Sequence, residues 1–413
     1  MHLILLAYRL LIILLSPAIL GHIIWLSVKN RQSRYFWQRL GFHYSALPKR
    51  GLWFHCASVG EVNTLLPLLK NLHAKNARLR FIITTNTITG GKIVTRQNLD
   101  YLFHCYLPFD WSSSIRRFLV VAKPTGLYVM ETEIWPNLFA ACVHKKIPVR
   151  LINARLSSKT TSANRFVKSL LTLSLAKVKA IYARSDNDAN AYRQLGANED
   201  SIKNIGNLKF TTAINISQPT GNYKLAINRD YVLLASTHQD EEKRFYDIWK
   251  QLNRDELLVI APRHPERGTS IINQMDCKDI AIRSNGDEIN GQTKIFLLDT
   301  IGELKDLFAD AKLVIMGGSF AAIGGHNIME PASYNKAIIT GPHMENFKEE
   351  LEMMLTKKAI VQVPSYDKLE KQLIKLLDDE SYRTLVQNNT KKLSHNVEII
   401  LEEYTRLILS ENA

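Results

Sequence analysis

The chain has 413 residues, of which 46% are hydrophobic and 22% charged, and its formal net charge is +14. This length exceeds what one hydrophobic core usually organises, and the composition excludes a disordered chain, so we expect two globular domains. The four scattered cysteines form no C-x-x-C pair, which argues against a structural zinc site and for a reducing compartment.

The N-terminal residues are far more apolar than the rest of the chain. Residues 10–28 carry no formal charge and are about long enough to cross a ~30 Å hydrocarbon core as a helix. Because no cleavage site of small residues follows, we predict a retained membrane anchor over residues 1–30 and not a signal peptide. Lys29, Arg31, Arg34 and Arg39 follow at once, which predicts that the other domains lie on the cytoplasmic side. A buried core helix is the alternative.

The net positive charge indicates an acidic partner or substrate. Nucleic acid is one explanation, but the cationic residues are dispersed and are not interleaved with aromatic residues in any block, so we expect no nucleic acid. Anionic lipids of the membrane surface, or an acidic and phosphorylated substrate, account for the charge equally well and suit the anchor.

Residues 31–213 alternate short apolar runs with amphipathic helical patterns. Such a series predicts a parallel sheet that is covered by helices on both faces. The strands that we expect in this first domain are Leu52–Ala57, Phe81–Thr85, Leu127–Met130, Val149–Asn153 and Ala180–Ala183.

Residues 214–228 are polar, contain Pro219 and Gly221, and are predicted to be a linker. A second doubly wound domain is expected over residues 229–413, with a helical tail from Ser381 to Leu409 that crosses back onto the first domain. Two such domains face each other across a cleft, and ligands bind at the carboxyl ends of the strands. The strands expected here are Tyr231–Ala235, Leu257–Ala261, Ile295–Leu298, Leu313–Met316 and Ala337–Thr340.

A glycine-rich segment, Val314–Pro331, is the most informative stretch of the second domain. An apolar strand breaks on Gly317-Gly318, and the chain is expected to reopen as a helix near Asn327. This arrangement predicts bare backbone N–H groups and a helix N-terminus that would bind an anion such as phosphate. The spacing fits neither the dinucleotide G-x-G-x-x-G motif nor a Walker P-loop, and an ordinary glycine-rich loop is the alternative.

Polar groups also follow the strands of the first domain. Ser58 and Glu61 fit a helix capping box, and the alternative is that Glu61 is a general base facing the cleft. Glu131 and Glu133 follow a buried strand, where a solvated charged face is hard to justify. Lys209, just before the linker, could stabilise a developing phosphate charge.

Three further patterns bear on metal and anion binding. Residues 185–188 resemble a D-x-D metal motif, but Ser185 and Asp188 fit a helix start better. Arg263 and Arg267 suit bidentate contacts with phosphate or carboxylate. No H-E-x-x-H or other ligand spacing occurs among the twelve histidines, so we expect no metal site.

Taken together, these segments resemble the 3-deoxy-D-manno-octulosonic acid (Kdo) transferase family of lipid A biosynthesis. The resemblance runs in order along nearly the whole chain, which makes it specific although each piece is weak alone. Its segments are Ser58–Glu61, Thr84–Gly90, Tyr106–Asp110, Glu131–Asn137, Asn153–Ser157, Gly206–Lys209, Ser236–His238, Pro262–Arg267, Gly317–Ser319, Gly324–Pro331 and Gly341–His343. Cys56 stands where alanine is more usual, and Gln239-Asp240 replace a more common Glu-Gly.

The resemblance implies an α/β fold of GT-B type and an inverting glycosyltransferase of the inner membrane. Such an enzyme would move Kdo from CMP-Kdo onto the tetraacylated lipid A precursor, without a cofactor or a metal. By the same resemblance, Glu61 matches the general base, and Glu131 and Lys209 match groups that stabilise the transition state. The positions that match CMP-binding residues are Pro262, Arg263, Ile301, Gly302, Glu303, Asn327, Ile328, Met329 and Glu330.

Two other functions fit the same residues. Another GT-B enzyme, such as a UDP-sugar transferase or epimerase, would share the architecture. A membrane-tethered basic protein that binds lipid would share the anchor and the charge.

Overall fold

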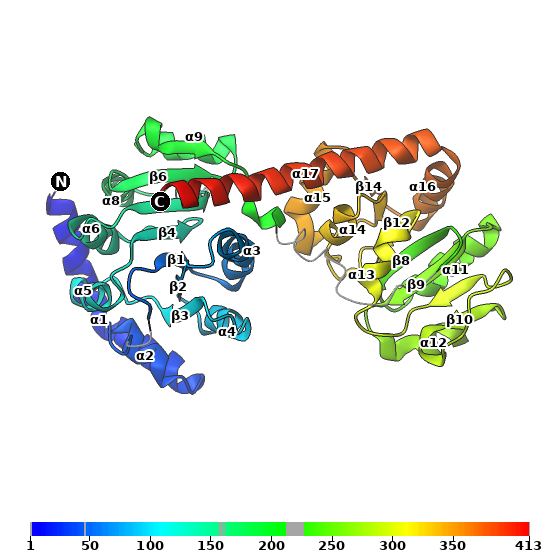
Figure 1. The fold of residues 1–413 in the computed structure, drawn as a ribbon, viewed down its shortest axis with the longest axis horizontal. Helices are drawn as coiled ribbons and strands as arrows, with labels where there is room; N and C mark the ends of the chain where they lie inside the picture. The colour runs from blue at the N-terminus through cyan, green and yellow to red at the C-terminus, as the bar shows by residue number, and fades with distance from the viewer. Residues whose placement is uncertain (1, 45–46, 157–159, 161, 212–226, 413) are drawn as a thin grey trace. The chain divides into compact units, whose positions relative to one another are not determined.

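The computed structural model describes the whole chain except residues 1, 45–46, 157–159, 161, 212–226 and 413 (Figure 1). The chain divides into two compact units, the first made of residues 1–212 and 400–413 and the second of residues 213–399. Each unit holds one parallel seven-stranded sheet with covering helices. The prediction of two doubly wound α/β domains preceded by an apolar helix is therefore confirmed. Most of the predicted linker, residues 214–228, lies outside the described residues.

The sheet of the first unit has the strand order β3-β2-β1-β4-β5-β6-β7, with every neighbouring pair parallel. The order reverses between β1 and β4, and in such sheets this switch point is where ligands bind. The strands are β1 (Leu52–Cys56), β2 (Phe81–Thr85), β3 (Leu102–Tyr106), β4 (Gly126–Met130), β5 (Val149–Ala154), β6 (Val178–Ala183) and β7 (Ile202–Asn204).

Alternate side chains of these strands build two cores, one on each face of the sheet. Trp53, Val129 and Leu151 point to one face, which α5, α6 and α8 cover. Phe54 and Tyr128 point to the other face, which α3, α4 and the end of α17 cover. The helices of this unit are α1 (His2–Lys29), α2 (Ser33–Arg39), α3 (Val59–Lys75), α4 (Ile88–Arg96), α5 (Ser112–Ala122), α6 (Pro136–His144), α8 (Arg165–Leu175) and α9 (Asp186–Gln194).

Helix α1 is long and apolar enough to cross a membrane. One side of it nevertheless contacts the rest of the first unit. Tyr8 donates a hydrogen bond to the buried Asp110 at 2.9 Å, and the Arg9 guanidinium donates one to Asn137 at 2.8 Å. Further along, Ile23 packs with Tyr35 in a small apolar cluster. The opposite side of α1 is exposed and apolar, with exposed leucines, isoleucines and Trp25. Figure 1 shows α1 running past α5 toward α2.

The second unit repeats this topology, with the strand order β10-β11-β9-β8-β12-β13-β14 and its switch point between β8 and β12. Its strands are β8 (Tyr231–Thr237), β9 (Leu257–Pro262), β10 (Ile280–Ile282), β11 (Ile295–Leu297), β12 (Leu313–Met316), β13 (Ile338–Thr340) and β14 (Val361–Gln362). Its helices are α11 (Glu241–Leu252), α12 (Gly268–Asn273), α13 (Leu304–Asp310), α14 (Met329–Ser333), α15 (Lys348–Thr356), α16 (Tyr366–Asp378) and α17 (Glu380–Ser410).

Helix α17, drawn in red in Figure 1, begins in the second unit and contributes its residues from Ile400 onward to the first. Tyr404 is fully buried in the core of the first unit, where its hydroxyl accepts a hydrogen bond from the backbone of Asn153. Just beyond the helix, Glu411 forms an ion pair with the buried Arg150 at 2.8 Å. The hydrophobic core on one face of the first sheet is therefore completed by the last residues of the chain.

Candidate active site

Glu61 lies in the first turn of α3, directly after β1 and thus at the switch point of the first sheet. Ser58 is the N-cap of this helix, since its hydroxyl accepts a hydrogen bond from the Glu61 backbone N–H at 3.2 Å. The Glu61 carboxylate in turn accepts hydrogen bonds from the Ala57 N–H at 2.8 Å and the Ser58 hydroxyl at 3.1 Å. The predicted cap is therefore confirmed, and it holds the carboxylate in place instead of excluding a catalytic role.

Burial makes this carboxyl group unusually basic. Glu61 is only 8% exposed, and desolvation raises its pKa to about 7 although the Ala57 N–H favours the charged form. The negative charges of Glu131 and Glu133 contribute to this rise, and the Ser58 hydroxyl opposes it. A carboxyl group with a pKa near neutrality is suited to accept a proton and to release it again.

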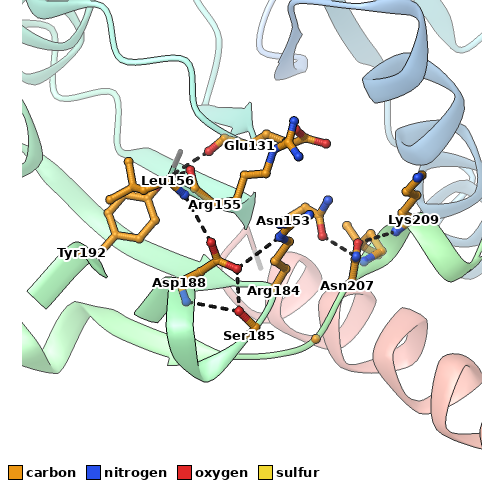
Figure 2. Close-up of polar contacts among 12 residues, drawn as sticks. Glu131, Asn153, Arg155, Leu156, Arg184, Ser185, Asp188, Tyr192, Asn207 and Lys209 are labelled. Carbon is orange, nitrogen blue, oxygen red and sulfur yellow. Dashed lines mark hydrogen bonds and ion pairs between the residues drawn. The ribbon is translucent and has the colours of Figure 1, made fainter. Parts of the chain in front are cut away.

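Glu131 follows β4, on the other side of the same switch point. Its backbone lies in the left-handed region at φ +55°, as does that of Asn153 at the end of β5, at φ +50°. Such positions cost energy for residues other than glycine and cluster at functional sites. Arg155 holds the Glu131 carboxylate in an ion pair of 2.6 Å, and Figure 2 shows its side chain reaching from the end of β5 toward Glu131.

Lys209 lies in the short turn η2 (Leu208–Phe210), which packs against α3, the helix that carries Glu61. The Asn153 side chain fixes this turn by accepting a hydrogen bond from the Leu208 N–H at 2.9 Å (Figure 2). Asn207 caps the turn through the Lys209 N–H at 3.0 Å. The carboxyl ends of the strands of the first sheet thus bring together three predicted site residues, Glu61, Glu131 and Lys209.

Sequence reasoning gave no individual role to a second group of side chains at this edge. Asn86, after β2, donates a hydrogen bond to Glu133 at 3.1 Å and accepts one from the buried Arg39 at 3.1 Å. The His55 Nε2 lies 3.9 Å from the Glu133 carboxylate. Burial alone would raise the pKa of Glu133, but His55, Trp135 and Asn86 outweigh it and lower that pKa. The charged form is therefore favoured for Glu133, whereas burial disfavours the charged form of Glu61.

Ser185 caps α9 and Asp188 is its partner, as predicted. The Asp188 carboxylate also receives the Leu156 N–H at 3.2 Å and the Arg184 guanidinium at 3.1 Å (Figure 2). These contacts occupy the carboxylate with protein donors. Among the described residues, no group of three or more His, Cys, Asp and Glu side chains could hold a metal ion.

In the second unit, the predicted bare N–H groups of the glycine-rich segment are already bonded. The buried Glu241 carboxylate, at the start of α11, accepts hydrogen bonds from the N–H groups of Gly318 at 2.7 Å and of Phe320 and Ala321 at 3.1 Å. It also accepts the His238 N–H at 2.9 Å. The loop carries its own internal anion, so the prediction that these N–H groups bind phosphate is wrong. Helix α14 is only five residues long and adds little dipole.

Two positions of this loop nevertheless require glycine for steric reasons. A Cβ atom on Gly317 would lie 2.6 Å from the Ser236 carbonyl oxygen, and one on Gly318 would lie 2.8 Å from the His326 ring. Gly318 also has φ +64°. Glycine therefore lets the loop pass close to the end of β8 and to the imidazole of His326.

Two charged residues of this unit, Arg267 and Glu303, have ion-pair partners within the protein. Arg267 forms a bidentate ion pair with the fully buried Glu242, at 2.8 and 3.1 Å. Of the two partners predicted for it, phosphate or carboxylate, it therefore binds a carboxylate of the protein itself. Glu303 pairs with Arg283 at 2.7 Å, and this contact lowers the pKa of Glu303. Its neighbours Ile301, which is 89% exposed, and Gly302, at φ +100°, lie in an open loop after β11.

At the switch point of the second sheet, two histidines meet. The Nε2 atoms of His238, after β8, and His326, after β12, are 2.8 Å apart, and the rings stack at 5.0 Å. Burial, then the nearby His238, Arg263 and His264, lower the pKa of His326 to about 4. A histidine directly after an apolar strand and another after a glycine pair are the signals that could have singled them out.

Arg263 supplies an exposed cation beside this pair, following Pro262, the last residue of β9. Among the described residues, it forms no ion pair within 4 Å, and its charge acts on His326 and Glu330. Burial raises the pKa of Glu330, while Lys305 and Arg263 oppose that rise. The Asn327 side chain accepts the Met329 N–H at 3.1 Å, and Ile328 and Met329 are buried. Pro262, Arg263, Asn327 and Glu330 thus frame one edge of the second sheet.

Comparison with known proteins decides the family. Residues 34–212 match the family described as 3-deoxy-D-manno-octulosonic-acid transferase (kdotransferase). A 3-deoxy-D-manno-octulosonic acid transferase of Haemophilus influenzae is 31% identical over 394 residues, which cover 92% of each chain. This chain belongs to the Kdo transferase family. A family member from Rickettsia typhi is 32% identical over 368 residues, covering 86% of this chain and 79% of the other.

The Kdo transferases are glycosyltransferases, so the prediction of an enzyme of this class is confirmed. Among solved structures, a UDP-GlcNAc 2-epimerase from Neisseria meningitidis aligns with a TM-score of 0.52 and 13% identity, covering 86% of this chain and 99% of that one. At this identity the likeness shows the fold alone. It agrees with the predicted GT-B type.

Proposed function

We propose that this Kdo transferase moves Kdo from CMP-Kdo onto the lipid A precursor with inversion, and that Glu61 is the general base. The observation that carries this proposal is the Glu61 carboxyl group itself. It is buried at the switch point of the first sheet, fixed by the Ala57 N–H, and has a pKa of about 7. A base poised near neutrality can take the proton of an acceptor hydroxyl as that hydroxyl attacks.

The step that we propose is a single displacement. The acceptor oxygen forms a bond to the anomeric carbon of Kdo, the bond from that carbon to the phosphate oxygen breaks, and the hydroxyl proton passes to Glu61. CMP leaves with the electron pair of the broken bond. Attack from the face opposite the leaving group inverts the anomeric centre.

Positive charge is needed where the phosphate leaves. Lys209 in the first unit and Arg263 in the second are the cations that we assign to this task. Glu131 is held by Arg155, and we propose that this pair orients groups of the transition state. With these side chains in place, the step that we propose requires neither a metal nor a cofactor.

We assign the donor nucleotide to the second unit. Arg263 is exposed beside His326, and Asn327 and Glu330 lie on the same loop. Glu330 is a carboxylate, so we propose that it accepts hydrogen bonds from ribose hydroxyls and does not contact phosphate. Pro262, Ile328 and Met329, with the loop of Ile301, Gly302 and Glu303, complete the CMP contacts that we propose.

We further propose that α1 attaches the enzyme to the cytoplasmic face of the inner membrane. The exposed apolar side of α1 supports this placement, as do the cations at and after its C-terminal end, Lys29, Arg31 and Arg34. An acylated and phosphorylated acceptor would then be reached in the membrane where it resides.

The test is to incubate the purified enzyme with CMP-Kdo and tetraacylated lipid A precursor and to follow product by mass spectrometry. Transfer is expected from the wild type and from the control Glu199→Gln, an exposed surface carboxylate, but not from Glu61→Gln. Turnover of a UDP-sugar without Kdo transfer would overturn the donor assignment. A Glu61→Gln variant with wild-type activity would overturn the general base.

A further inference from the structure

Two adjoining cavities lie beside α1 in the first unit. They measure about 620 and 460 Å³. Arg9, Ser112, Ser113 and Asn137 line both of them. Because four residues are shared, the two cavities adjoin, and together they lie between α1 and the neighbouring helices α5 and α6. We call the two together the α1 groove.

One end of the α1 groove is cationic. Arg116 on α5 and His144 and Lys145 at the end of α6 line it, together with Arg9 from α1. No aspartate or glutamate is among the lining residues of either cavity. Ser112 and Ser113 add hydroxyl groups from the first turn of α5. This end therefore offers positive charge and hydrogen-bond donors, which suit a phosphate group.

The other end of the groove is apolar. Ile12, Ile13 and Leu20 of α1 line it, with Leu40 and Trp111 from the rest of the unit. The cationic and the apolar ends are joined by Arg9, whose guanidinium is fixed to Asn137 at 2.8 Å. A groove with this polarity matches a molecule that has a phosphate at one end and a hydrocarbon chain at the other.

We propose that the α1 groove binds one anionic glycerophospholipid of the bilayer. Its phosphate would lie among Arg9, Arg116 and Lys145, and an acyl chain would lie along Ile13, Leu20 and Leu40. The proposal rests on the proposed membrane attachment of α1, whose outer side carries exposed apolar residues such as Leu14, at 77% exposed. The bound lipid would join the helix to the folded unit at the depth of the headgroups.

The position of the groove separates this lipid from the acceptor. Helices α5 and α6 cover one face of the first sheet, whereas α3, which carries Glu61, covers the opposite face. A lipid held between α1, α5 and α6 is therefore assigned as a bound partner and not as the molecule that is glycosylated.

The experiment is native mass spectrometry of the full-length protein, released from mild detergent after equilibration with equal amounts of phosphatidylglycerol and phosphatidylcholine. The wild type is expected to retain one phosphatidylglycerol per chain in preference to phosphatidylcholine. Arg116→Gln with Lys145→Gln should reduce that retention about tenfold, since each cation near a lipid surface contributes appreciably. The matched control is Lys70→Gln with Arg96→Gln, which removes the same charge from α3 and α4.

A second pair of variants separates binding from folding. Ser113→Glu places a negative charge in the first turn of α5, where a carboxylate favours the helix, yet it should repel the lipid phosphate and reduce retention about tenfold. Ser113→Gln, of similar size but neutral, should retain the lipid. Thermal unfolding of Ser113→Glu is expected to match or exceed that of the wild type.

Three results would overturn the proposal. Equal retention in the wild type and in Ser113→Glu would show that the groove is not the site. Equal loss in the Lys70/Arg96 control would show that overall charge and no specific site is responsible. Displacement of phosphatidylglycerol by lipid A precursor, one for one, would assign the groove to the acceptor. Sedimentation with phosphatidylcholine vesicles tests the attachment of α1 separately, and neither measurement depends on Kdo transfer.

Discussion

The Nε2 atoms of His238 and His326 lie 2.8 Å apart, so one of the two rings must donate its proton to the other. The two residues are 88 positions apart in the sequence and follow β8 and β12, the strands that flank the switch point of the second sheet. Such a pair can be bonded while it carries no charge or one charge, but not two. Its protonation state and the shape of the glycine loop are therefore linked.

Because the pKa of His326 is lowered to about 4, its ring stays neutral in the folded protein while the unfolded chain binds a proton below pH ~6.5. Stability is therefore expected to fall as the pH drops from about 6.5 toward 4, because the unfolded state then binds more protons. His326→Gln should remove about 1 kcal/mol of that loss at pH 5, after allowance for solvent screening. Urea unfolding at pH 5 and pH 7 measures it, with the exposed His395→Gln as control. If the unfolding free energy of His326→Gln changed with pH as much as that of the wild type, the neutral state of His326 would be contradicted.

We expect Glu61 to lower the stability of the folded protein at high pH although it is needed for activity. Its pKa of about 7 lies above the unfolded value of ~4.3, so the folded state loses stability as the pH rises between these values. Glu61→Gln should therefore be more stable than the wild type at pH 8, by up to about 3 kcal/mol, while transfer falls about 10²- to 10⁴-fold. Wild-type activity should rise with pH through about 7, as the base becomes charged. Loss of activity together with loss of stability would point to a structural role only.

Glu241 should prove essential to the glycine loop although it contacts no substrate in our assignment. Glu241→Gln replaces one acceptor oxygen by an NH₂ group that faces backbone N–H donors, and should destabilise the protein by about 2 to 4 kcal/mol. The KM for the donor should rise more than kcat falls. Asp247→Asn, an exposed position on the same helix, should change stability by less than about 0.5 kcal/mol. A fully stable Glu241→Gln variant would contradict the hydrogen bonds described above.

The Arg150–Glu411 pair is the clearest case of a buried charge held by a distant residue. Arg150 is 1% exposed and Glu411 also receives the Tyr182 hydroxyl at 2.7 Å. Glu411→Gln should destabilise the protein by about 3 kcal/mol, because it leaves the arginine uncompensated. Arg150→Met combined with Glu411→Gln should recover much of that loss. The exposed Glu398→Gln, on helix α17, is the control in urea unfolding; an equal effect there would refute the pairing argument.

Much of the fold followed from local patterns. The predicted strands Phe81–Thr85 and Leu313–Met316 have the observed boundaries, since each is an apolar run with turn residues beside it. β3, Leu102–Tyr106, was missed because His104 interrupts its apolar run. β14 has only two residues, which is too short for any periodicity.

The site was predictable where the partners are close in sequence. Ser58 and Glu61 are three residues apart, and their reciprocal contacts were foreseen from that spacing. Glu241 binds the N–H of Gly318 from 77 residues away, so the sequence left that N–H group apparently open to a ligand. For Arg267, phosphate and carboxylate were both left open as partners, because Glu242, 25 residues before it, could not be identified from spacing. Whether a charged side chain stabilises the fold or binds a ligand depends on partners that lie far away in the sequence.

The ion pair between Arg150 and Glu411 also bears on the order of synthesis. Residues 1–212 leave the ribosome first, but the core that they form lacks Tyr404 and Ile408, and Arg150 lacks its counter-charge, until residue 411 has been made. The second unit is continuous in sequence and has no such requirement. In nascent chains that stop before Glu411, the second unit should therefore be folded while the first unit is not. Folding of the first unit would then depend on synthesis of the last residues of the chain.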